Sequence, residues 1–134
     1  LRLVFEATEQ MPDEDFSFRP TPEVRSFGEV VGHIVSSAFE YCSASLGQPV
    51  PEADADLRAN PTKPDLLAGL SAAKNYCDEA YSVTDAQLAE PVPQRGVGVR
   101  AQALIFNASH THNHYGNLVT YMRLKGMVPP STAR

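Results

Sequence analysis

Hydrophobic residues along this chain recur mostly at intervals of three and four, which is the period of an amphipathic helix. The clearest case follows Ser26, where apolar residues keep this spacing at Phe27, Val30, Val31, Ile34, Val35, Ala38, Phe39 and Cys42. Ser26 and Glu29 form the capping-box pattern that opens helices, and Gly47 is a residue type at which helices commonly end. The pattern therefore predicts a helix between Ser26 and Gly47.

The N-terminal segment carries the same period. Residues 1–11 fit the end of a helix, which is expected to be truncated at its N-terminus, and Pro12 closes it. Residues 13–22 are a predicted loop in which Phe16 and Phe18 fold back on the core.

A third helix is predicted to start near Thr62, which forms a partial capping box with Asp65, and to end before Asp85. The connection before it, residues 48–64, holds four of the eleven prolines and little periodicity. It is interpreted as a surface connection whose unusual length, about 15 residues, is typical of functional loops.

The last helix is predicted from about Val99 to Lys125, after a turn over residues 91–98. Basic residues in its final turn, followed by Gly126, match the usual C-terminal pattern. Four helices without a convincing strand pattern or an internal repeat predict an all-α fold, a four-helix bundle.

Composition adds little bias. The 134 residues suit a single domain, 1–134, with 43% hydrophobic and 20% charged residues, as in ordinary soluble proteins. A net charge of -5, with no basic cluster, argues against a nucleic-acid partner. No apolar run approaches the roughly 18 residues of a membrane span, and no signal peptide opens the chain. A cytoplasmic protein is expected.

Two cysteines, Cys42 and Cys77, lie on the apolar stripes of two predicted helices. They can form at most one disulfide, and core packing is the preferred interpretation.

Three of the four histidines lie within five residues, at His110, His112 and His114. On a helix, residues four apart share a face, so His110 and His114 can point at one object while His112 points nearly the opposite way. A strand would place all three on one face, but about twenty residues whose only breaker is Gly116 favour the helix. Two imidazoles at this spacing can hold two corners of a metal's coordination shell.

His33, on the second predicted helix, is the candidate third ligand. It shares a polar flank with Glu29 and Glu40, almost opposite the apolar stripe, so the pattern alone places it in solvent. In the other interpretation this flank faces the histidines of the last helix across a wet cleft. Glu29 and Glu40 would then be partners of the ligands or acid–base groups, although solvated glutamates are the simpler interpretation.

The histidine flank of the last helix also carries Asn107, Asn117 and Tyr121. Asn117 and Tyr121 lie one and two turns beyond His114. They are candidates for contacts with the metal-ligating histidines or with a substrate, and plain interhelical hydrogen bonds are the equal alternative. His112 falls among apolar residues on the other side, where a packed or partner-facing histidine is expected.

Two segments carry a family resemblance. The stretch from His110 to Gly126, with His-x-x-x-His and a Leu-x-Gly ending, and the capped helix start from Ser26 to His33 resemble the signatures of the DinB-like (damage-inducible, YfiT-like) four-helix bundle proteins. The resemblance implies a divalent metal, commonly nickel or zinc, held by His33, His110 and His114, and frequent homodimers. This sequence departs in having Tyr115 where many members have Arg after the last ligand, and in lacking Trp.

Characterised members of that family include thiol-dependent S-transferases and a maleylpyruvate isomerase, and others are proposed metal-dependent hydrolases. The resulting hypothesis is an enzyme whose metal activates a low-molecular-weight thiol or a water for attack on a small-molecule substrate. The alternative is a non-catalytic, metal-binding stress-response interaction module with a structural ion. In either case a homodimer without nucleic-acid or membrane partners is expected.

Overall fold

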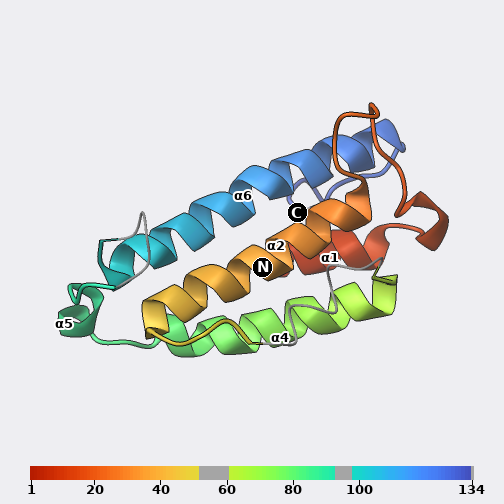
Figure 1. Cartoon of the computed structure of the whole chain (residues 1–134). Coiled ribbons are helices and arrows are strands. Elements are labelled where there is room, and N and C mark those ends of the chain that lie inside the picture. The colour runs from red at the N-terminus through yellow and green to blue at the C-terminus, as the bar shows by residue number, and fades with distance from the viewer. Residues whose placement is uncertain (52–60, 93–97, 134) are drawn as a thin grey trace.

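The helical period of the sequence is realised as a bundle in the computed structural model, which describes residues 1–51, 61–92 and 98–133 (Figure 1). The main helices are α1 (Arg2–Gln10), α2 (Phe27–Leu46), α4 (Lys63–Tyr81) and α6 (Arg100–Leu124), with a short 3-10 helix η1 (Asp13–Asp15) and a short helix α5 (Asp85–Leu88). Within the described residues there is no β-strand, only an isolated bridge between Pro91 and Val99. The predicted all-α bundle is confirmed.

The helix ends lie where the local sequence places them. At the start of α2, the Glu29 N–H donates to Ser26 Oγ (3.3 Å) and the Ser26 N–H donates to the Glu29 carboxylate (2.6 Å). Thr62 and Asp65 repeat this arrangement at the start of α4. Gly47 ends α2 with φ at 69°, a left-handed conformation that glycine adopts without strain.

Helix α2 packs along both α4 and α6, and α1 packs along α4 and α6 as well. Figure 1 shows α2 running between α6 and α4 along their length. The apolar stripes meet in one core, whose largest fully buried side chains include Met11, Phe27, Ile34, Leu66, Leu70, Leu118 and Met122. None of the helices in the described part of the chain is long and apolar enough to cross a membrane.

The loop after α1 folds back on this core, as predicted. The Phe16 ring packs against Phe27 with ring centroids 5.4 Å apart, and Phe18 packs against Tyr121 at 6.0 Å. The backbone N–H of Phe27 also donates to the Phe18 carbonyl (2.9 Å), which fixes the start of α2.

The chain after α6 turns back on the helix. Gly126 has φ at 76°, and the Met127 N–H donates to the Met122 carbonyl (2.9 Å). Further on, the backbone N–H of Ser131 donates to the hydroxyl oxygen of Tyr115 (3.1 Å). The terminal segment is thereby tied to α6.

The cysteines correct one expectation. Cys42 on α2 and Cys77 on α4 are buried, as predicted, but they form a disulfide, with Cα atoms 5.3 Å apart. Helical periodicity places each cysteine on an apolar stripe but does not give the register of one helix against the other. The two stripes face each other, so the sulfurs meet.

Other expectations concern the connections. Most of the predicted long connection 48–64 and of the turn 91–98 lies outside the described residues, at 52–60 and 93–97. Helix α5 was not predicted, although its Thr84–Gln87 capping box follows the same pattern as those of α2 and α4.

Candidate metal centre

The three candidate histidines meet where α2 and α6 lie side by side. His33 comes from the first half of α2, and His110 and His114 come from successive turns of α6. His33 Nε2 lies 3.1 Å from His110 Nε2. The ring centroids are 4.8 Å apart for His33 and His110, 4.7 Å for His33 and His114, and 4.4 Å for His110 and His114. The structure thus brings together the residues that the sequence singled out.

The donor set fits a divalent ion. Each histidine offers one ring nitrogen, and these nitrogens lie within 4.8 Å of one another. Around a tetrahedral zinc ion with bonds of about 2.0–2.1 Å, two nitrogens are about 3.3 Å apart, so small side-chain rotations suffice. Among the residues that the structure describes, no fourth His, Cys, Asp or Glu joins this group. The cluster can hold a metal ion with three protein ligands.

The surroundings keep two of the imidazoles neutral. Burial lowers the pKa of His33 to about 4, with further contributions from the positive charge of Arg25 and from the other two histidines. Burial is also the main reason that the pKa of His110 is lowered, and the positive charges of His114 and Arg25 lower it further. Because only a neutral imidazole has a lone pair for a metal, these rings are in the binding form at neutral pH without losing a proton first.

One neighbour orients a ligand. His114 Nδ1 donates to the side-chain oxygen of Asn117, at 3.2 Å and one turn further along α6. A proton fixed on Nδ1 leaves the lone pair on Nε2 for a metal, and such partners commonly fix the ring of a ligating histidine. The predicted ligand-contact role of Asn117 is therefore consistent with its position.

The other two polar residues of this flank turn away from the cluster. Tyr121 is buried, and its hydroxyl donates to the Arg25 carbonyl (2.9 Å), which ties α6 to the residue before the α2 cap. Asn107 is also buried, and its amide faces the disulfide sulfurs. Tyr121 therefore follows the alternative of an interhelical hydrogen bond, and Asn107, for which no role was predicted, also contacts another helix.

The remaining candidates do not join the donor group. His112 is exposed, with Nδ1 2.8 Å from the Ala108 carbonyl oxygen of its own helix, so it is not packed in the core. Glu29 is exposed, and its carboxylate accepts hydrogen bonds from the backbone N–H of Ser26 and from Arg19 Nη2 (3.0 Å). The capping hydrogen bond from Ser26 is the main reason that the pKa of Glu29 lies below its usual range. Glu40 is exposed at the surface of α2.

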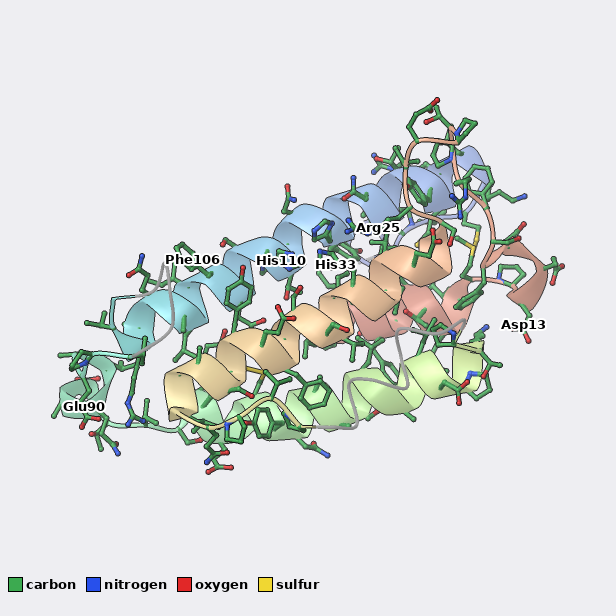
Figure 2. All side chains as sticks on the ribbon, in the orientation of Figure 1. Asp13, Arg25, His33, Glu90, Phe106 and His110 are labelled. Atoms are coloured by element: carbon green, nitrogen blue, oxygen red, sulfur yellow. A yellow bond between two sulfur atoms is a disulfide. The ribbon has the colours of Figure 1, made fainter. Side chains whose placement is uncertain are left out.

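Sequence reasoning missed the groups on either side of the cluster. The Tyr41 ring lies 5.8 Å from the His110 ring and 6.1 Å from Phe106, centroid to centroid. Figure 2 shows Phe106, His110, His33 and Arg25 in this order along the side where α2 and α6 meet. Tyr41 lies eight positions after His33, about 80° around α2 and outside the polar flank predicted for His33, and Arg25 lies before the helix, so periodicity singled out neither residue.

Comparisons with known proteins agree with this architecture. A crystal structure of a DinB-like protein, YjoA, from Bacillus subtilis superposes with a TM-score of 0.73 at 20% sequence identity, covering 95% of this chain and 86% of that one. At this identity the likeness shows a shared fold. No curated protein matches the chain significantly. The family model of the DinB superfamily matches residues 1–118. The chain therefore belongs to the DinB superfamily.

Proposed function

We propose that this protein is a metal-dependent enzyme in which His33, His110 and His114 hold a divalent ion, nickel or zinc. The ion would activate a low-molecular-weight thiol or a water for attack on a small-molecule substrate, in S-transferase or hydrolase chemistry. The observation that carries the proposal is the cluster itself, three imidazoles from two helices with nitrogens within 4.8 Å of one another. Catalytic zinc sites typically have three protein ligands and one open position, whereas structural sites have four protein ligands.

The chain's own residues would prepare the site in two ways. His33 and His110 present neutral nitrogens at pH 7 because burial lowers the pKa of both. Asn117 holds the His114 ring in one tautomer through the hydrogen bond to Nδ1. A divalent ion bound there would lower the pKa of a thiol or water and polarise a substrate oxygen.

The flanking side chains suit a small substrate. The positive charge of Arg25 acts on His33 and His110, and it would attract an anionic nucleophile or a substrate carboxylate to the same place. The rings of Tyr41 and Phe106 would offer an apolar surface next to His110.

The ligand assignment is tested by metal analysis of purified variants. After loading with nickel or zinc and removal of free metal, His33→Ala, His110→Ala and His114→Ala should each lose most of the bound ion. His112→Ala is the matched control from the same helix and should bind like the wild type. If His112→Ala loses the ion and His110→Ala keeps it, the assignment is wrong.

The catalytic role needs a second experiment. Cobalt-substituted protein should show a new charge-transfer absorption on adding a thiol if the ion activates thiols. Hydrolysis of activated esters or amides without a thiol would indicate water instead. Circular dichroism of the metal-free protein should show the bundle still folded. Unfolding on metal removal, with no spectral change and no turnover across a broad substrate panel, would leave a non-catalytic binding module with a structural ion.

A further inference from the structure

A cavity of about 340 Å³ reaches the disulfide from the side of α1, α4 and α6. Its lining includes Cys77 and Tyr81 from α4 and Asn107 and Ala108 from α6. None of the three clustered histidines lines it. Cys42, the other half of the disulfide, does not line it either and is 0% exposed. Cys77 is buried as well, at 4% exposed, but it is the half of the disulfide that borders the cavity, whereas Cys42 is enclosed by other side chains.

A buried amide is directed at both sulfurs. Asn107 is 5% exposed, and its Nδ2 lies 3.4 Å from Cys42 Sγ and 3.7 Å from Cys77 Sγ. The same nitrogen donates to the Tyr81 hydroxyl (3.4 Å), which in turn donates to the Leu104 carbonyl (3.0 Å). A disulfide sulfur is a weak acceptor, whereas a thiolate is a charged and strong one. The amide is therefore better satisfied when Cys42 is a thiolate than when it is bonded to Cys77.

We propose that the Cys42–Cys77 disulfide is a thiol-exchange site for a low-molecular-weight thiol that enters this cavity. The incoming thiol gives its proton to water, and its sulfur attacks Cys77 Sγ. The Cys77–Cys42 bond breaks, a bond between the small thiol and Cys77 forms, and the electron pair leaves with Cys42, whose thiolate accepts the Asn107 hydrogen bond. A second small thiol, after losing its proton to water, can then attack the sulfur of the first small thiol in this mixed disulfide. This step releases a disulfide of the two small thiols and leaves Cys77 as a thiolate. This site does not depend on the metal or on the proposed enzymatic activity.

The position of attack follows from two separate observations. Access selects Cys77, because only Cys77 lines the cavity. The leaving group is favoured at Cys42, because the shorter amide contact goes to Cys42 Sγ. Both predict a mixed disulfide at Cys77.

The wild-type chain tests this directly. The oxidised protein is incubated under native conditions with glutathione as the probe thiol, quenched with an alkylating agent and mapped by peptide mass spectrometry. We expect glutathione on Cys77, the alkylating agent on Cys42, and a rate proportional to the glutathione concentration. An adduct on Cys42, or a rate that does not depend on glutathione because unfolding must come first, would overturn the proposal.

Two variants test the cavity and the amide. Ala108 is exposed at the edge of the cavity, so Ala108→Phe narrows the entrance and should slow the exchange about tenfold or more, while Thr120→Phe, at an exposed position of the same helix away from the cavity, should leave it unchanged. Equal rates for both would refute entry through the cavity.

Asn107→Leu keeps the size of the side chain but removes the amide donor, so the exchange should slow roughly tenfold and the pKa of the Cys42 thiol in the reduced protein should rise. Unchanged values of both would refute the role of the amide, and if this variant does not fold, the wild-type mapping and Ala108→Phe still decide the proposal.

Discussion

Reduction of the Cys42–Cys77 disulfide should lower the free energy of unfolding by about 4 kcal/mol. The two cysteines are 35 residues apart in the sequence, so the bond closes a loop of this length in the unfolded chain. The chain-entropy relation gives a stabilisation of about 4 kcal/mol at 25 °C for such a loop. Single domains have a total stability of about 5–15 kcal/mol, so the bond would supply a quarter or more of it.

The assay is thermal unfolding with and without a reductant, followed by circular dichroism. With an unfolding entropy of about 2.1 cal/mol/K per residue, a loss of this size in a chain of 134 residues lowers the Tm by about 14 °C. The double variant Cys42→Ala/Cys77→Ala is the control. It should unfold somewhat below the reduced wild type, because it also loses buried sulfur atoms, and the reductant should not change its Tm.

A shift of less than about 3 °C on reduction would refute the reasoning, since the loop constraint would then contribute almost nothing. A reductant effect on the double variant would show that the shift has another cause. The size of this shift also gives the stability that the protein would have in the cytoplasm, its expected location. Disulfides are rare in reducing compartments, so a cytoplasmic chain would work mainly in its dithiol form, at the lower stability.

Four further predictions concern the site, the tail and the assembly. Asn117→Ala removes the acceptor for His114 Nδ1, so metal affinity measured by competition with a chelator should fall about 10–100-fold, and an unchanged affinity would show that the contact is incidental. Since burial lowers the pKa of His33 to about 4, between pH 6.5 and 4 the unfolded chain binds a proton that the folded chain does not. The metal-free protein should therefore lose stability as the pH falls through this window, by about 1–2 kcal/mol after allowance for partial solvent exposure, and His33→Gln should flatten the dependence in urea titrations. Tyr115→Phe leaves the Ser131 N–H without its acceptor, so the terminal segment should be cleaved faster in limited proteolysis at a cost of about 1 kcal/mol or less, while an unaltered cleavage rate would count against this anchor. The homodimer expected from the family should sediment as such at micromolar concentration, and a monomer would remove that expectation.

The helices were predictable because their determinants are local. Ser26 with Glu29 and Thr62 with Asp65 lie within one turn of each other, and each pair makes the hydrogen bonds that its spacing implies. Gly126 adopts the left-handed conformation that ends α6. The pairing of His110 with His114 also follows from spacing, since residues four apart share a helix face whatever lies opposite.

Contacts between helices were not predictable in the same way. The polar flank of α2, taken alone, places His33 in solvent, and only the packing of α2 along α6 brings it to the other histidines. The same limit applies to Cys42 and Cys77, whose stripes were predicted but whose register was not. Asn107 shares the predicted polar flank of His110, yet it lies three residues earlier, about 60° around the helix, and this rotation is enough to turn it toward the disulfide.

The departure from the family pattern at Tyr115 can now be placed in three dimensions. Tyr115 follows His114 directly, so its side chain points about 100° away from that ligand, and it is 7% exposed with its hydroxyl holding the terminal segment. The substitution of Tyr for Arg therefore concerns the anchoring of the tail and leaves the three histidines untouched. Arg25, next to the α2 cap, adds a positive charge near the cluster; burial is the main cause of the lowered pKa of His33 and of His110, and Arg25 contributes to both. If the proposed function holds, Arg25 is the residue at which substrate preference in this chain should first be sought.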